Sequence, residues 1–286
     1  MEIIIAGPYI GELGFEIGNW IPYLASIRNK YDSMVVFARN GHQDLYPFAD
    51  EFIGFDFGLE TRHCDKNWMM KPFPEEVDRY TVLEEHVKQY AMSLKGHKVS
   101  LLLSNQSIRK LEFSGRVPTV LTGSKEKIKE WEQKLPLGLK VVFVVRSYTR
   151  GASKNTDPKL LNQVICELKN KVGVDCILVG QEELPFKCEA RSECVDLLNQ
   201  TSVSDLIAIY NLSKVVVGAS TGTIHLAAAC GTPHVTWVSW VGDIPAIQDR
   251  YYNSWNLNKT PIRYLLTKQI TSETVVDGVL SFIDSY

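Results

Sequence analysis

The stretch VVVGASTGTIHLAAACGTP, residues 215–233, decides the fold class of this 286-residue chain. It opens with a short apolar run typical of a buried strand, passes through a turn of small polar residues, and continues with the spacing of a short helix. A Gly-Thr-Pro exit then leads into another apolar run at 233–238. This order of strand, helix and strand is a βαβ unit, whose two strands lie parallel in one sheet. We therefore expect an α/β protein.

The same alternation continues on both sides of this stretch. Short apolar runs predict further strands, and amphipathic spacing predicts the helices between them. The expected strands are 3–6, 34–38, 99–103, 119–121, 139–145, 175–179 and 214–218, and the expected helices are 18–30, 124–134, 158–171 and 203–210. The breaker Leu-Pro-Leu-Gly at 135–138 indicates two Rossmann-like domains, 1–135 and 136–286, with parallel sheets facing a central cleft. We leave open whether the last helix of the second domain packs back on the first domain.

The composition and charge of the chain exclude several classes of protein. Hydrophobic residues make up 45% of the sequence, enough for a core in each half, and the net charge of −2 argues against affinity based on broad neutralisation of nucleic-acid phosphates. The six cysteines form no C-x-x-C pair, so we expect reduced, packed thiols and no metal site. We find neither a signal peptide nor a transmembrane segment. This predicts a cytoplasmic protein, with peripheral attachment to the inner membrane surface left open.

The turn at Ser220, Thr221, Gly222 and Thr223 has the composition of an anion-binding site. Small residues let a ligand approach the backbone, and the free N–H groups and dipole of the following helix favour negative charge. The hydroxyls of Ser220 and Thr221 offer further donors, with helix capping as the alternative role for one of them. His225 follows near the helix start and is a further candidate for the diphosphate site. The alternative is a partly buried histidine that orients the turn.

This stretch resembles the bacterial ADP-heptosyltransferases, a glycosyltransferase family 9-like group, and their wider GT-B relatives. The family pattern here is a strand, Asp-Ser/Thr-Gly-x-x-His, Leu-Ala-Ala-Ala and Gly-x-Pro, and this chain matches it at Thr221, Gly222, His225, 226–229, Gly231 and Pro233. Ser220 departs from the pattern, because the family usually has Asp there. The resemblance covers residues 140–240 and implies a GT-B fold, with the donor diphosphate held at 220–225. It also implies a nucleotide-diphosphate sugar as co-substrate and no other cofactor.

A second group of candidate phosphate ligands follows the strand expected at 139–145. Arg146, Arg150 and Lys154 stand in a loop rich in Gly, Ser, Thr and Asn, at the end of a strand where open α/β sheets bind ligands. Arginine gives phosphate two parallel hydrogen bonds, and lysine gives a point charge. In similar GT-B enzymes this loop supplies a cation to the leaving diphosphate, and Arg146 is the first candidate. A solvated basic loop is the alternative.

Carboxylates provide two further candidate roles. Glu182 and Glu183 follow the strand expected at 175–179, where an acid can bind both ribose hydroxyls, although exposed turn carboxylates are the alternative. Glu12 and Glu16 lie in a loop with four glycines, and transfer with inversion needs a base for the acceptor hydroxyl. Similar heptosyltransferases carry an acid after Ile-Gly in this loop, which implies Glu12 as the base and Glu16 as the second candidate. Cap or surface roles are the alternative for both.

These features predict an enzyme that moves a hexosyl, heptosyl or pentosyl group from a nucleotide-diphosphate sugar to an acceptor hydroxyl, with inversion and without a metal ion. The family default for the acceptor is a surface glycan or a lipid-linked sugar. Three alternatives stay open: a transferase acting on a hydroxymethylated pyrimidine of DNA, a nucleotide-sugar 2-epimerase, and a non-catalytic glycan- or nucleotide-binding protein. The two acids of the glycine loop argue against the last of these.

Overall fold

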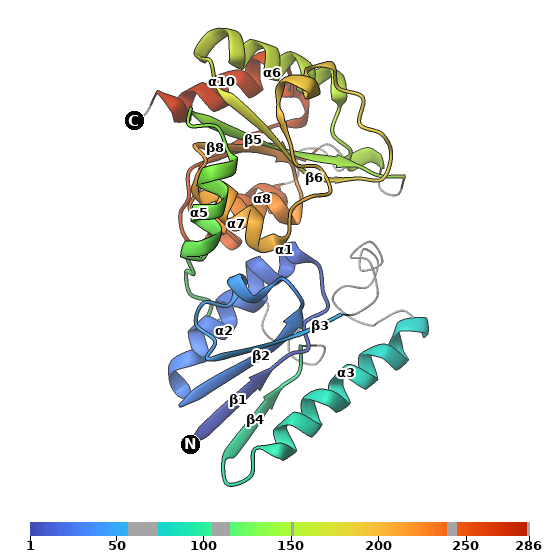
Figure 1. Cartoon of the computed structure of the whole chain (residues 1–286), viewed down its shortest axis with the longest axis vertical. Helices are drawn as coiled ribbons and strands as arrows, with labels where there is room; N and C mark the ends of the chain where they lie inside the picture. Colours follow the sequence, from blue (N-terminus) through green and yellow to red (C-terminus); the bar gives the residue numbers. More distant parts are fainter. Residues whose placement is uncertain (57–73, 105–114, 150–151, 239–244, 285–286) are drawn as a thin grey trace. The chain divides into compact units, whose positions relative to one another are not determined.

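The computed structural model describes residues 1–56, 74–104, 115–149, 152–238 and 245–284. The chain forms two compact units, Met1–Thr119 and Val120–Tyr286, each built on a sheet of its own (Figure 1). Among the described residues, no helix is both long and apolar enough to cross a membrane.

The first unit is a four-stranded parallel sheet in the order β3-β2-β1-β4. Its strands are β1 (Glu2–Ala6), β2 (Ser33–Arg39), β3 (Glu51–Phe55) and β4 (Lys98–Leu102). Its helical segments are α1 (Leu13–Phe15), the π-helical turn η1 (Glu16–Trp20), α2 (Ile21–Ile27), η2 (Arg28–Lys30), η3 (Gln43–Leu45) and α3 (Pro74–Ser93). On one face, Ile3, Ile5, Val35 and Phe37 pack with Val87 of α3, and the alternate residues of β1 and β2 are buried on the other face.

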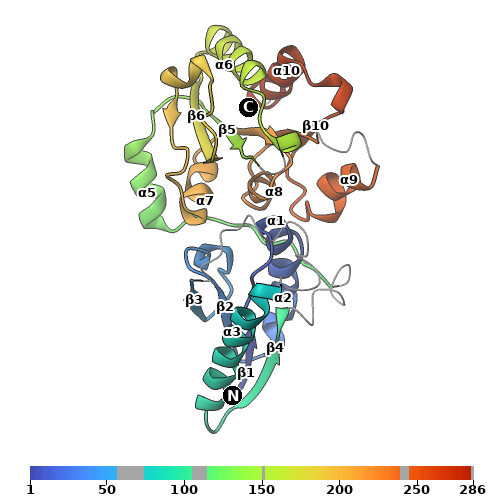
Figure 2. The same ribbon diagram turned by 90° about the vertical axis from the view of Figure 1, so that its right-hand side faces the viewer.

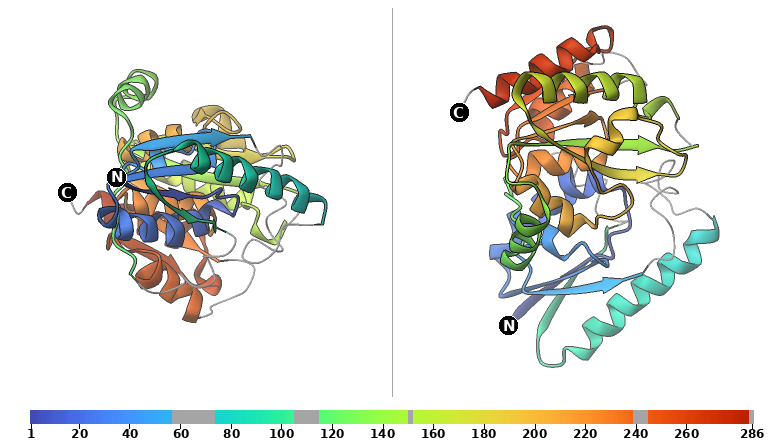
Figure 3. Two further views of the ribbon diagram at one scale, coloured as in Figure 1. Left: turned by 90° about the horizontal axis from the view of Figure 1, so that it is seen from below. Right: turned by 45° about the horizontal axis from the view of Figure 1, so that its top comes forward.

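The second unit is a six-stranded parallel sheet in the order β10-β9-β8-β5-β6-β7. Its strands are β5 (Lys140–Ser147), β6 (Asp175–Glu182), β7 (Val195–Asp196), β8 (Val215–Ala219), β9 (His234–Trp237) and β10 (Ile262–Leu265). Its helical segments are α5 (Lys125–Lys134), η5 (Ala152–Lys154), α6 (Pro158–Val172), η6 (Glu189–Glu193), α7 (Val203–Asn211), α8 (Gly222–Ala229), α9 (Pro245–Asp249), η7 (Arg250–Ser254), η8 (Thr267–Gln269) and α10 (Ser272–Ile283). The helices α6 and α10 lie side by side on one face, and α7 and α8 cover the other (Figure 2 and Figure 3).

Local signals fix where α6 begins and ends. The carboxylate of Asp157 accepts hydrogen bonds from the N–H groups of Lys159 at 2.9 Å and Leu160 at 3.4 Å. Gly173 ends the helix in the left-handed region at a φ of 63°, a conformation that glycine adopts without steric cost. Between these two ends the helix presents buried Ile165 to the sheet, where it joins the main core of the unit.

The division between the units lies earlier than the break expected after residue 135. The helix α5 packs against α7, and the indole N–H of Trp131 donates a hydrogen bond to Asp205 at 2.9 Å. Because α5 shares contacts with α7, residues 120–135 belong to the second compact unit. The last helix, α10, packs against α6, β8 and β9 of its own unit. Residues 119–121, expected as a strand, are irregular, and the N–H of Leu121 bonds to the carbonyl of Ala229 instead.

Each sheet has one topological switch point. In the first sheet the chain runs from β1 to β2 and β3 on one side, and β4 joins β1 on the other. In the second sheet the chain runs from β5 to β6 and β7, and β8 then joins the opposite side of β5. Ligands of open α/β sheets bind beyond the carboxyl ends of the strands at such points. The predicted α/β class with two parallel sheets is confirmed, and the loops after β1, β5 and β8 are where a site is expected.

Candidate active site

The switch point of the second sheet brings Arg146 and Ser220 to neighbouring strand ends. Val144 of β5 lies opposite Gly218 of β8, so two positions further on Arg146, still in β5, lies beside Ser220, which directly follows β8. Adjacent strands are about 4.8 Å apart. Both residues are partly exposed. The backbones of Arg146 and Ser220, which precedes α8, therefore lie at the same edge of the sheet. Arg150, the third cation of the sequence candidates, lies outside the described residues.

The start of α8 has backbone donors that no other described residue engages. Thr221 is the N-cap residue in extended conformation, and its carbonyl accepts the N–H groups of Ile224 at 3.2 Å and His225 at 3.4 Å. Its side chain does not cap the helix, and its Oγ1 lies 2.7 Å from Oγ1 of Thr223. No hydrogen bond among the described residues uses the N–H of Gly222 or Thr223. These groups form a cluster of donors at the positive end of a helix, which suits an anion.

The loop after β5 is shaped by its own polar contacts. The Asn155 side-chain amide donates a hydrogen bond to the carbonyl of Tyr148 at 2.8 Å and accepts one from the N–H of Tyr148 at 3.0 Å. The N–H of Arg146 donates to the hydroxyl of Thr156 at 3.0 Å, and its guanidinium carbon lies 4.5 Å from the centre of the Tyr148 ring. Lys154, partly buried, ends the short turn η5 in the same loop. Two of the predicted cations, Arg146 near the end of β5 and Lys154 in the loop, thus stand on a backbone that is held by side-chain hydrogen bonds.

His225, in the first turn of α8, is buried in the core. Its ring stacks on Tyr251 at 4.7 Å between centroids and meets Trp255 edge-on at 4.6 Å. Burial lowers the pKa of His225 to about 3, and His234 and Arg250 act in the same direction. The ring is therefore neutral at physiological pH and adds no positive charge for a diphosphate. Its contacts are those of a buried histidine that joins η7 to α8.

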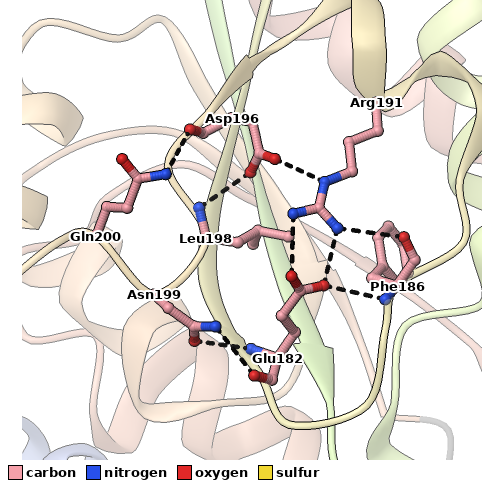
Figure 4. Close-up of polar contacts among 7 residues, drawn as sticks. All are labelled: Glu182, Phe186, Arg191, Asp196, Leu198, Asn199 and Gln200. Atoms are coloured by element: carbon pink, nitrogen blue, oxygen red, sulfur yellow. Dashed lines mark hydrogen bonds and ion pairs between the residues drawn. The ribbon is translucent and has the colours of Figure 1, made fainter.

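Glu182 takes part in an ion-pair network at the end of β6 (Figure 4). Its carboxylate accepts two hydrogen bonds from the guanidinium of Arg191, at 2.9 and 3.0 Å, and one from the N–H of Phe186 at 3.0 Å. Arg191 also donates to Asp196 of β7 at 2.6 Å. The hydrogen bonds from Arg191 lower the pKa of Glu182. The first ribose candidate is thus occupied in holding the segment between β6 and β7.

Glu183, the next residue, has a different setting. Its side chain is exposed, and one carboxylate oxygen accepts hydrogen bonds from the N–H of Thr149 at 3.3 Å and from its hydroxyl at 3.1 Å. Thr149 belongs to the loop that carries Arg146. Of the two ribose candidates, Glu183 therefore has the exposed carboxylate and the contact with the phosphate-binding candidates.

The glycine loop after β1 fits closely onto its neighbours. Gly7 has a φ of 124°, and a Cβ atom there would lie 2.2 Å from the carbonyl oxygen of Phe37. A Cβ atom on Gly11 would lie 2.5 Å from the hydroxyl of Tyr9. The N–H of Gly7 also donates to the carbonyl of Leu102 in β4 at 2.9 Å. The close approach explains why glycine occupies these two positions.

Glu12 stands where this loop becomes a helix. Its carbonyl accepts the N–H groups of Phe15 at 3.1 Å and Glu16 at 3.0 Å, and the hydroxyl of Tyr9 at 3.1 Å. Its side chain is partly exposed and does not cap α1. The carbonyl of Glu12 is therefore held by three donors, and the residue is partly exposed. A general base needs this combination of fixed position and access.

Glu16 begins the π-helical turn and is completely buried, with 0% of its surface exposed. His42 Nδ1 lies 3.1 and 3.0 Å from its two carboxylate oxygens, and the hydroxyl of Tyr46 donates to it at 2.5 Å. Burial and the neighbouring carboxylate raise the pKa of Tyr46 well above its usual value, so this phenol stays a donor. Glu16 has the contacts of an anchor for the loop and none of the access that a base requires.

Arg39 is a site residue that the sequence pattern does not single out. Only 8% of it is exposed, and its guanidinium donates hydrogen bonds to the carbonyl of Gly11 at 2.9 Å and to that of Ile10. These two carbonyls directly precede Glu12, so Arg39 fixes the peptide that leads into the candidate base. The available signal was a cation at the end of an apolar strand, which describes many surface residues as well. His42 and Tyr46 carried no signal at all.

A metal site is not among the features of the described residues, which contain no group of three or more His, Cys, Asp or Glu side chains arranged to hold an ion.

Comparison with known proteins gives a family match over part of the chain and a similar fold over all of it. The sequence pattern of glycosyltransferase family 9 (heptosyltransferase) matches residues 179–261, a range that includes the start of α8. No curated protein sequence matches the chain.

Three solved structures are similar over the whole chain. ADP-heptose LPS heptosyltransferase II of E. coli has a TM-score of 0.63 at 15% identity, with 100% of this chain and 99% of that chain covered. A glycosyl transferase family 9 protein of Veillonella parvula DSM 2008 has a TM-score of 0.63 at 11% identity, with 100% and 97% covered. The E. coli heptosyltransferase WaaC with ADP has a TM-score of 0.55 at 15% identity, with 100% and 99% covered. At these identities the likeness shows the fold.

The family segment and the fold agree with the strand, helix and turn that the motif at 215–233 predicts. Together they show a GT-B fold and, over residues 179–261, a segment that is similar to glycosyltransferase family 9 (heptosyltransferase).

Proposed function

We propose that the chain transfers a sugar from a nucleotide-diphosphate donor to an acceptor hydroxyl with inversion and without a metal ion. The observation that supports this most strongly is that Arg146 and the start of α8 lie at neighbouring strand ends, at the switch point of the second sheet. Glycosidic bond cleavage leaves negative charge on the diphosphate, and fixed cations and N–H groups stabilise such charge without reorganisation.

In this proposal the N–H groups of Gly222 and Thr223 and the hydroxyls of Thr221, Thr223 and Ser220 bind the diphosphate. Arg146 adds paired hydrogen bonds, and Lys154 adds charge from the same loop. Glu183 is the proposed ribose ligand, because its carboxylate is exposed and lies against that loop. ADP is the nucleotide named with WaaC, so ADP-linked sugars are the first donors to test.

The proposed base is Glu12, at the switch point of the first sheet. It removes the proton of the acceptor hydroxyl as the oxygen attacks the anomeric carbon, so that the new bond forms on the face opposite the leaving group. Arg39 and Tyr9 hold its backbone in place. A glycan or lipid-linked sugar is the proposed acceptor class, and the cytoplasm, including the inner membrane surface, is the proposed location.

The test is Glu12→Gln, which keeps the size of the side chain and removes the basic oxygen. General base catalysis contributes about 10²- to 10⁴-fold in rate. We therefore expect transfer to fall by at least about 100-fold, with donor affinity unchanged. The matched control is Glu2→Gln at the opposite end of β1, where the carboxylate pairs with Lys98 at 3.0 Å and transfer should continue. Unchanged turnover of Glu12→Gln would remove this residue as the base.

The same assay separates the rival functions. Incubation of the wild-type chain with a nucleotide-sugar alone should give slow hydrolysis at most, whereas conversion of the sugar would indicate an epimerase. Transfer to hydroxymethylated DNA but not to glycans would indicate a DNA-modifying enzyme. Tight nucleotide binding without turnover on any acceptor would indicate a binding protein.

A further inference from the structure

Two cysteines lie side by side at the edge of the second sheet. The strands β6 and β7 run parallel, with Ile177 opposite Val195 and Leu178 opposite Asp196. One position earlier, the same register places Cys176 of β6 beside Cys194, which directly precedes β7, and the two side chains are within hydrogen-bond reach. Adjacent strands are about 4.8 Å apart, inside the roughly 4.4–6.8 Å between Cα atoms that disulfides span. Both thiols pack into the core cluster on the face that α6 covers.

The two thiols differ in access. Cys176 is 2% exposed, whereas Cys194 is partly exposed at the sheet edge. The ammonium of Lys169, on α6, is held next to Cys194 by hydrogen bonds to the carbonyl of Glu193 at 2.9 Å and to its carboxylate at 3.0 Å. A nearby cation stabilises a thiolate, which is the reactive form of cysteine.

The pKa values of the two thiols also differ, and the more exposed Cys194 has the lower one. As a thiol, Cys194 donates to the carbonyl of Ala190 at 3.2 Å. As a thiolate it accepts a hydrogen bond from Cys176, and this bond, with the charge of Lys169, lowers the pKa of Cys194 against the effect of burial. The same hydrogen bond, together with burial, raises the pKa of Cys176. Cys194 is thus the attacking sulfur, and Cys176 holds its proton until a partner sulfur is presented.

We propose that Cys194 and Cys176 form an oxidisable dithiol that hydroperoxides convert to a disulfide. The Cys194 thiolate attacks one peroxide oxygen, the O–O bond breaks, and hydroxide or alkoxide leaves, which gives a sulfenic acid. The Cys176 sulfur then attacks the Cys194 sulfur, the S–O bond breaks, and water leaves with the Cys176 proton. The two thiols lose two electrons in total, and one peroxide gains them.

The bridge closes the chain segment 177–193 at its base. That segment contains the Glu182–Arg191 network, which joins the end of β6 to η6 (Figure 4). A disulfide restricts such a loop mainly in the unfolded chain, so oxidation should raise the stability of this edge of the sheet. The inference does not depend on the proposed transfer reaction.

Peptide mapping tests the bridge directly on the full chain. Trypsin cleaves after Lys171, Lys187, Arg191 and Lys214, so Cys176, Cys188 and Cys194 fall on separate peptides, 172–187, 188–191 and 192–214. After hydrogen peroxide treatment and alkylation of free thiols, we expect 172–187 joined to 192–214, and we expect reductant to release the two. Recovery of Cys194 alkylated, over-oxidised, or joined to any cysteine other than Cys176 would overturn the proposal.

Variants separate the two roles. In Cys176→Ser, the sulfenic acid on Cys194 should persist and be trapped by a dimedone-type reagent, whereas Cys194→Ser should prevent oxidation of Cys176. Lys169→Gln should slow bridge formation several-fold. The matched control is Cys166→Ser, which removes an exposed thiol on α6 and should leave the rate unchanged. Equal rates in wild type and Lys169→Gln, or bridge loss in the control, would contradict the assigned roles.

Discussion

Replacing Gly222 with proline removes one backbone N–H from the proposed diphosphate site and little else. Gly222 is the first residue of α8, a position where proline is favoured because its missing N–H has no partner within the helix. Proline also requires extended backbone in the preceding residue, and Thr221 already has φ −143° and ψ 167°. The variant should therefore fold, with its melting temperature close to that of the wild type.

The expected loss in affinity follows from the kind of bond removed. A hydrogen bond to a charged group contributes about 1.5–3 kcal/mol, and about 1.4 kcal/mol corresponds to a factor of ten in affinity. Gly222→Pro should therefore bind a nucleoside diphosphate or nucleotide-sugar roughly ten- to a hundredfold more weakly. Gly222→Ala is the matched control, because it keeps the N–H and adds only a methyl group.

Isothermal titration with ADP and ADP-sugars measures both variants against the wild type, with thermal unfolding as the check on folding. If Gly222→Pro binds as tightly as Gly222→Ala and the wild type, the N–H of Gly222 does not hold the ligand. If both variants lose affinity equally, the site excludes a side chain but does not use this donor. Either result refutes the proposed diphosphate contact at this amide.

Three further predictions address the rest of the site. Arg39→Lys keeps the charge but cannot bond two carbonyls in one plane, so turnover should fall about tenfold with donor affinity unchanged; equal turnover would show that Arg39 does not position Glu12. Glu183→Ala should weaken nucleotide binding, whereas Glu182→Gln should lower the melting temperature and leave binding intact; the reverse pattern would exchange the two roles. The third concerns acid: burial lowers the folded-state pKa of His225 to about 3 and of His234 to about 4, below the value of 6.5 for a free side chain. The unfolded chain then binds these protons first, so stability present above pH 6.5 is lost as the pH falls toward 3. Urea unfolding at pH 7 and pH 5 should show a loss of about 2 kcal/mol for each histidine, and His225→Phe should halve it; an unchanged loss would contradict a buried neutral ring.

The parts of the fold that the sequence predicts are those with strong periodicity. The strands β1, β2, β5, β6 and β8 are unbroken apolar runs, because a parallel strand in the middle of a sheet is buried on both faces. Three of the four edge strands were not predicted: β3 is half exposed, β7 is only two residues long, and β10 has four residues. The fourth edge strand, β4, was predicted within one residue of its observed bounds. The sequence predicts the domain division at a proline and a glycine, 135–138. In the structure α5 packs on α7, where Trp131 bonds to Asp205, so the division lies before α5.

The candidate site divides in the same way. Arg146, Ser220 and Glu12 could be found because each follows an expected strand at its carboxyl end. Arg39 reaches Gly11 and Ile10 across 28 and 29 positions of sequence, and Arg191 reaches Glu182 across nine. Only the folded chain shows such pairs. For that reason the residue pattern did not separate Glu182 from Glu183, and it did not show that Glu16 is buried.

The buried carboxylate of Glu16 has a consequence for engineering. Its partners, His42 and Tyr46, follow β2, and Arg39, which holds the peptide before Glu12, is the last residue of that strand. A chimera that takes residues 7–16 from a relative while keeping residues 39–46 would leave His42, Tyr46 and Arg39 without the partners that they have in this chain. The two segments should therefore be transplanted together, as a single cassette, when acceptor preference is to be redesigned.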